Sequence, residues 1–242
     1  MTRSTRHKTM LPPPLMTSEP GSFARQTIVQ RKPQLITQAI EDNGYPPEIV
    51  RRLEVFRNEI ASKPMQPLTE HAADVDLWNG ELAALGGRAW LDAPWYFAET
   101  FFYRRLMEAV GYFQVGPWKG RDPFGLQKQA QMAIAAERLA GEWDDLEAAD
   151  PVVALEALIH SSLWGNRADL SNETIRLTVH GGLAAREERH NVLIDDSDVV
   201  CRTMMGGLER VDVVADNVGL DFTFDLALAD LLLRQGWAQQ VV

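Results

Sequence analysis

The sequence predicts an α/β protein in which a large N-terminal helical region precedes the start of a Rossmann-like α/β/α layer, so the residues present are mostly helical. Two observations predict this class. Apolar residues recur at helical spacing through most of the first 165 residues. Near the C-terminus, a β-branched run from Val211 to Ala215 is followed by a loop, an apolar helix and a second run from Ala238 to Val242. Strand, loop, helix and strand in this order are typical of the opening of a parallel sheet.

Proline and glycine divide the first part of the chain. Residues 1–22 hold the run Pro12–Pro14 and are expected to form an extended lead-in, because proline removes backbone donors and fixes φ. Two helices are expected between residues 23 and 60, with Gly44 ending the first and Pro47 opening the second. Residues 61–72 are expected to form a linker.

Four more helices are expected before the change of pattern. Their ranges are Asp74–Leu85, Pro94–Val110 with its many aromatic residues, Gln127–Trp143, and a helix that Asp150 caps and that ends at Gly165. We therefore divide the chain into the lead-in, a helical domain of residues 23–150 and an incomplete α/β metal- and substrate-binding domain of residues 151–242.

Composition excludes several function classes. The net charge of −10 and the pI near 5.0 disfavour a general nucleic-acid binder. No apolar run reaches about 18 residues, so no membrane span is expected. The single cysteine, Cys201, excludes an intrachain disulfide and is expected to be a packed thiol in a reducing, cytoplasmic setting. An acidic protein repels an anionic metabolite unless a cation or a cluster of donors reverses the local field.

The first candidate site follows the Val211–Ala215 run. Asp216 and Asn217 place a carboxylate beside an amide oxygen, and both are hard ligands suited to Mg²⁺ or Mn²⁺. Ligands of open α/β sheets bind at the carboxyl ends of strands, and the amides of the next helix favour phosphate. Asp221, in the first turn, could bind sugar hydroxyls or could merely complement the helix dipole. A plain Asp-Asn turn is the other interpretation of this segment.

The second candidate site is the polar segment that follows the helix ending at Gly165. Arg167 could clamp a phosphate, and Asn166 and Asp169 could bind hydroxyls or orient the shell of a cation. The alternative is a helix C-cap at Gly165 followed by an N-cap at Ser171.

Two other charged groups favour structural roles. Glu99 with Arg104 or Arg105 on the aromatic helix could reach a site, but ion pairing within the fold is the simpler interpretation. The acidic residues between Asp195 and Asp198 lack the pattern of a calcium loop and favour a solvated loop or a helix cap.

Several segments together resemble a known family. In order along nearly the whole chain, they are Leu11–Leu15, Gly21–Ala24, Pro94–Arg105, Asp122–Phe124, Ser162–Ser171 and Asp216–Asp221. On these segments the chain resembles the damage-control phosphatases, in particular their acidic-residue methyltransferase-like subgroup. The segment from Trp164 to Ser171 is long and unusual in composition, so it is a specific signal, and the Asp216–Gly219 segment becomes specific when it follows the others in this order.

The resemblance implies a metal-dependent phosphatase for small sugar phosphates such as fructose 1-phosphate or fructose 6-phosphate, with Mn²⁺, Co²⁺, Ni²⁺ or Mg²⁺ as the cofactor. Asp216 and Asn217 match the first two metal ligands of the family, and Asp216 is the expected catalytic residue. Asp221 matches a substrate-binding position at which the family usually has Glu. The third metal ligand of the family, a later Asp, has no counterpart, so we expect a chain truncated at its C-terminus and inactive alone.

Two other functions stay open at this point. An S-adenosylmethionine-dependent carboxyl methyltransferase is one, although the loop after the strand has one glycine, Gly219, where a cofactor loop usually has more. The other is a non-enzymatic helical interaction module built around the aromatic helix.

Overall fold

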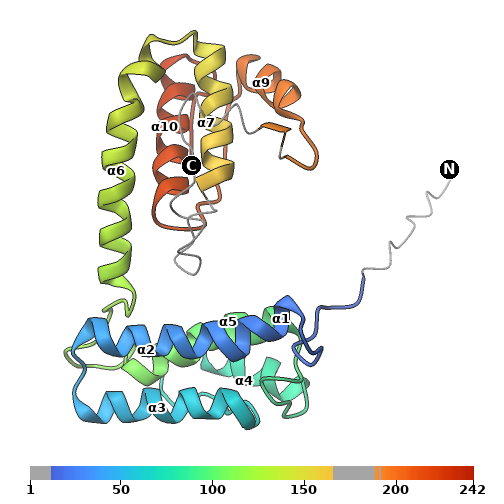
Figure 1. The fold of residues 1–242 in the computed structure, drawn as a ribbon, viewed down its shortest axis with the longest axis vertical. Coiled ribbons are helices and arrows are strands. Elements are labelled where there is room, and N and C mark those ends of the chain that lie inside the picture. The colour runs from blue at the N-terminus through green and yellow to red at the C-terminus, as the bar shows by residue number, and fades with distance from the viewer. Residues whose placement is uncertain (1–11, 166–188, 191) are drawn as a thin grey trace, which may run out of the picture. The chain divides into compact units, whose positions relative to one another are not determined.

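The structure is a computed structural model that describes residues 12–165, 189–190 and 192–242. Its contacts divide the chain into two compact units, a first unit that ends at Phe124 and a second unit that begins at Gly125. The second unit thus includes residues 125–150, which the sequence analysis assigned to the helical domain. Figure 1 shows the helices of each unit.

The first unit is helical. Its elements are α1 (Phe23–Gln26), the π-helical turn η1 (Thr27–Arg31), α2 (Lys32–Asn43), α3 (Pro47–Ser62), α4 (Val75–Ala84) and α5 (Trp95–Val110). The predicted helix boundaries are confirmed at these two positions. Gly44 follows the end of α2 with a left-handed φ of 59°, and Pro47 is the first residue of α3.

Aromatic side chains of α5 form the centre of the first unit. Phe101 and Phe102 are fully buried, and Phe102 stacks on Phe56 of α3 with ring centroids 5.4 Å apart. Trp90, also fully buried, stacks on Phe101. The aromatic helix of the sequence analysis is therefore a core helix, since rings of this size dominate the apolar area that a fold buries.

The second unit contains α6 (Gly125–Ala148), α7 (Pro151–Gly165), α9 (Ser197–Met205) and α10 (Leu220–Arg234). The predicted cap of α7 is confirmed, because Asp150 accepts a hydrogen bond from the Val152 amide at 2.9 Å. α10 packs against both α7 and α6, and α7 also contacts α9 (Figure 1). Apolar residues of these helices, among them Leu155, Phe224 and Leu232, form one buried core.

The predicted parallel pairing is present only as two isolated bridges within the described ranges. Leu208 pairs with Ala238, and Val211 pairs with Val241, both in the parallel direction. Backbone hydrogen bonds accompany these bridges, for example from the Val211 amide to the Gln240 carbonyl at 2.9 Å. The described residues are otherwise mostly helical and form no continuous strand, so an α/β layer is not established.

The helices of the described ranges are each too short or too polar to cross a bilayer. Cys201 is buried and makes no disulfide, as expected for a packed thiol.

Candidate functional site

Three predicted site residues come together at the N-terminus of α10. The Asn217 side-chain nitrogen donates to Asp216 Oδ2 at 3.1 Å, and the Asn217 backbone amide donates to Asp221 Oδ2 at 3.2 Å. The bond to Asp216 engages the nitrogen of the Asn217 side chain and not its oxygen. The loop thus gathers two carboxylates and an amide beside the first turn of a 15-residue helix.

The two carboxylates have different surroundings. Asp216 is exposed to solvent, whereas Asp221 is 7% exposed. Burial raises the pKa of Asp221 above its ordinary value, although the amides of Phe222 and Asn217 donate to the carboxylate and oppose this shift. No cationic side chain of the described residues pairs with Asp221, so its negative charge is offset by hydrogen bonds from backbone amides and from the Asn217 side chain.

The end of α7 lies directly against the start of α10. A Cβ added to Gly165 would lie 2.4 Å from both the Cα and the backbone nitrogen of Asp221. One turn earlier on α7, the Ser162 hydroxyl donates a hydrogen bond to Asp225 of α10. Only a glycine at position 165 allows this approach, because the two backbones nearly touch.

Of the second candidate site, Asn166, Arg167 and Asp169 lie outside the described residues. Gly165, the residue before them in the sequence, lies against Asp221. From the sequence alone, Gly165 is expected only as a possible helix C-cap. The contact with Asp221 was not predicted, because nothing in the sequence pairs these two positions.

The side-chain oxygens of Asp216 and Asn217, before the start of α10, are of the type that binds hard cations. A carboxylate oxygen and an amide oxygen are ligands that Mg²⁺ and Mn²⁺ accept, and Asp216 is open to solvent. Within the ranges that the structure describes, no group of three or more His, Cys, Asp and Glu side chains is arranged to hold a metal ion. Asp216 and Asn217 would thus supply part of a coordination shell.

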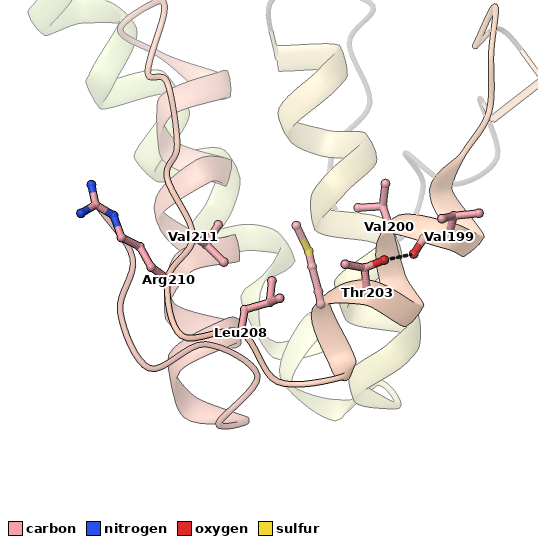
Figure 2. Close-up of a pocket in the computed structure, with 7 residues that line it drawn as sticks. Val199, Val200, Thr203, Leu208, Arg210 and Val211 are labelled. Carbon is pink, nitrogen blue, oxygen red and sulfur yellow. Dashed lines mark hydrogen bonds between the residues drawn. The ribbon is translucent and has the colours of Figure 1, made fainter. Parts of the chain in front are cut away.

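A cavity of about 270 Å³ lies elsewhere in the second unit, between α9 and the segment of the parallel bridges (Figure 2). Its lining is apolar apart from Thr203 and Arg210, and the Thr203 hydroxyl is already bonded to the Val199 carbonyl at 2.8 Å. Arg210 forms an ion pair with Asp212. None of the predicted site residues lines this cavity, and its surface does not suit a phosphorylated ligand.

The other charged candidates have structural partners. Glu99 pairs with Lys32 of α2, Arg104 pairs with Glu70 and Asp74, and Arg105 pairs with Glu59 and Glu108. Ion pairing within the fold is therefore confirmed for this group.

The acidic cluster lies at the N-terminus of α9, where the N-cap residue Asp196 makes no side-chain capping hydrogen bond. Asp195 Oδ1 accepts a hydrogen bond from the Ser197 amide at 3.1 Å, and Asp198 lies in the first turn of α9. Hydrogen bonds from Ser197 and Arg189 lower the pKa of Asp195 to about 2. The helix α9 itself was not predicted.

The described residues are mostly helical, and two carboxylates and an amide come together at the N-terminus of one helix, α10. Comparison with known families gives a more specific assignment. Residues 27–242 match the profile of the damage-control phosphatase ARMT1-like domain. The chain belongs to this family.

Curated relatives agree with the family assignment. The chain is 29% identical to the damage-control phosphatase ARMT1 of Danio rerio, over 96% of this chain and 62% of the relative. It is 30% identical to the protein of that name from Xenopus tropicalis, over 91% and 60%, and 28% identical to that of Homo sapiens, over 96% and 63%. The chain thus spans about 62% of the length of the relatives.

Proposed function

We propose that the protein is a metal-dependent phosphatase of small sugar phosphates of the fructose 1-phosphate or fructose 6-phosphate type, acting in the control of metabolite damage. The observation that carries the proposal is the hydrogen-bonded cluster of Asp216, Asn217 and Asp221 at the N-terminus of α10. Family membership supports the reaction class, because the relatives are named damage-control phosphatases.

Each residue of the cluster has a distinct proposed role. Asp216 and Asn217 hold a divalent cation such as Mn²⁺, Co²⁺, Ni²⁺ or Mg²⁺ through their side-chain oxygens. The cation, when bound, polarises the phosphoryl oxygens and offsets their charge. The amides at the start of α10 add positive potential that favours the phosphate. Asp221 binds hydroxyl groups of the sugar, and its partial burial excludes water from that contact.

The cation also explains how an acidic protein binds an anionic substrate. With a net charge of −10, the protein as a whole repels a phosphate monoester. A bound divalent cation reverses the sign of the potential locally, and its own charge dominates the site. We therefore propose that sugar phosphate binds only together with the metal.

Asn166 and Arg167, with Asp169, stay part of the proposal as further substrate-binding residues. In the sequence they follow Gly165, the last residue of α7, which lies against Asp221. A guanidinium is suited to bidentate contact with a phosphate.

The proposal is tested by calorimetric titration of the 242-residue chain, first with Mn²⁺ and then with fructose 1-phosphate. We expect fructose 1-phosphate to bind only after Mn²⁺, and Asp216→Ala to weaken Mn²⁺ binding by about tenfold or more, as loss of a charged ligand costs at least about 1.4 kcal/mol. Two protein oxygens leave a six-coordinate cation largely hydrated, so we expect little or no phosphate release by these residues alone.

The matched control is Asp212→Ala, which removes an exposed aspartate of the same loop that pairs with Arg210 instead. This variant is expected to bind Mn²⁺ as the wild-type chain does. Fructose 1-phosphate binding that is equal with Mn²⁺ and with a chelator would refute the proposal. Micromolar binding of S-adenosylmethionine would favour a methyltransferase, and binding of neither ligand would favour a helical interaction module.

A further inference from the structure

The parallel bridges of the second unit have one paired side. Residues 208–214, called the edge segment from here on, form backbone hydrogen bonds with residues 237–242. The Val211 and Val213 amides donate to carbonyls of that partner at 2.9 and 2.8 Å. The side chains of these two valines are partly buried, and Val211 packs against the core that contains α10. These residues therefore fix the edge segment onto the second unit.

The residues that alternate with these valines form an open edge. The backbone groups of Arg210, Asp212 and Val214 make no hydrogen bond within the described part of the chain, and all three side chains are exposed. In an extended chain, the N–H and C=O groups of successive residues point to opposite sides, so these groups point away from residues 237–242. An unpaired edge of this kind is a template on which another extended chain can pair.

The charges on this edge are complementary to those of a second copy. Edges are often protected by lysine or proline, whereas Arg210 and Asp212 carry opposite charges and form an ion pair with each other. Both side chains are more than half exposed, so this pair contributes little and can exchange partners. In Figure 2 the Arg210 side chain extends away from α9. An edge of the same sequence can therefore meet it with opposite charges in contact.

We propose that the 242-residue chain self-associates through this edge, with two copies pairing antiparallel about a two-fold axis at Val211. Arg210 of each copy then lies directly opposite Asp212 of the other, and the backbones of each such pair exchange both N–H···O bonds. Val211 faces its own counterpart in the non-hydrogen-bonded position, since its backbone groups already bond residues 237–242. The inference does not depend on the proposed function.

The charges select this register among the possible ones. An axis at Asp212 would place two carboxylates directly opposite each other, and an axis at Arg210 would do the same with two guanidinium groups. Like charges in opposite positions of an antiparallel pair are destabilising, whereas opposite charges there are stabilising. The axis at Val211 is therefore the one that uses both charges favourably.

Sedimentation velocity over a range of protein concentrations measures the association. The contact area is small, so we expect a weak dimer with a dissociation constant of about 100 µM. The chain is then mostly monomeric at about 5 µM and mostly dimeric at about 500 µM. A chain that stays monomeric over this range would overturn the inference.

Charge reversal tests the register. Arg210→Asp and Asp212→Arg each place like charges opposite each other, and each is expected to weaken dimerisation by about tenfold or more. The double variant restores opposite charges and is expected to dimerise as the wild-type chain does. Asp144→Arg is the matched control, because Asp144 is an exposed aspartate of α6 and its replacement makes the same change in net charge. Dimerisation that survives both single reversals, or a double variant that stays monomeric, contradicts the proposed pairing.

Disulfide formation between copies tests the position of the axis. In a non-hydrogen-bonded pair the Cα atoms lie about 4.5 Å apart, which allows a disulfide. Val211→Cys is therefore expected to give a disulfide-linked dimer under mild oxidation, and the wild-type chain, whose Cys201 is buried, is not. Val214→Cys is expected to link more slowly although Val214 is 91% exposed, because it lies off the axis. Faster linkage through position 214 than through position 211 would refute the inference.

Discussion

Replacing Gly165 with alanine is expected to destabilise the second unit by about 2 kcal/mol. The added Cβ would lie 2.4 Å from the backbone of Asp221, whereas carbon atoms in contact are normally about 3.5–4.0 Å apart. α7 and α10 must therefore separate by about 1 Å. Overpacking of this kind costs about 1–3 kcal/mol, and the obstacle is backbone, which places the cost near the upper end. The gain of about 0.5–1 kcal/mol for alanine over glycine in a helix offsets part of it.

Urea denaturation followed by far-ultraviolet circular dichroism measures this loss. With a slope of about 2 kcal/mol per molar urea, a loss of 2 kcal/mol lowers the midpoint by about 1 M. Gly141→Ala is the matched control, because Gly141 lies within α6 and a Cβ there meets nothing within 4 Å. This variant is expected to stabilise the chain by about 0.5–1 kcal/mol.

The two variants thus make the same chemical change in a helix and are expected to differ in sign. Because Gly165 abuts Asp221, its replacement is also expected to displace the first turn of α10 and to weaken Mn²⁺ binding. If Gly165→Ala stabilises the chain as Gly141→Ala does, the contact between the end of α7 and the start of α10 does not exist as described.

Further predictions concern the buried charges of the first unit. Arg104→Met is expected to cost about 3 kcal/mol in urea denaturation, because Glu70, with a side chain 6% exposed, loses its cationic partner; a loss below 1 kcal/mol would contradict this. The Arg104 hydrogen bond lowers the pKa of Asp74, so the stabilisation by Asp74 is present above about pH 4 and is lost as the pH falls below that value. In thermal melts recorded between about pH 2 and about pH 6, Arg104→Met should reduce the fall of the melting temperature at acid pH. If the melting temperature of the variant falls as steeply as that of the wild-type chain, other carboxylates cause the loss of stability. Lys32 is fully buried beside Glu99, so a double-mutant cycle of Lys32→Met and Glu99→Gln should give a coupling of about 1 kcal/mol or more, and additive effects would show that the pair is not coupled.

Local chain chemistry allowed much of the fold to be predicted. Gly44 and Gly111 end helices through their left-handed backbone, and Asp150 caps α7. These signals involve residues close in sequence, so the pattern of the sequence is sufficient to find them. The helix α9 was missed, because its acidic start was interpreted only as a loop or a cap.

The candidate site was predictable only in part, for a physical reason. Asp216, Asn217 and Asp221 are near neighbours in sequence, and a loop that leads into a helix brings them together. The approach of Gly165 to Asp221 and the packing of Gln131 on Gly219 are set by how α6, α7 and α10 pack. No sequence spacing encodes such tertiary contacts, so the contacts of Gly165 and Gln131 became known only from the structure.

The buried polar and charged side chains that lack partners support the candidate site at the N-terminus of α10. In the first unit, the buried cations Lys32 and Arg104 both have carboxylate partners. At the start of α10, by contrast, Asp221 is buried with a raised pKa and no cationic partner among the described residues. Gln131 of α6, which packs on Gly219, has an unpaired side-chain nitrogen among the described residues. A divalent cation held by Asp216 and Asn217 would offset the nearby charge of Asp221, so the chain is expected to gain stability when Mn²⁺ binds.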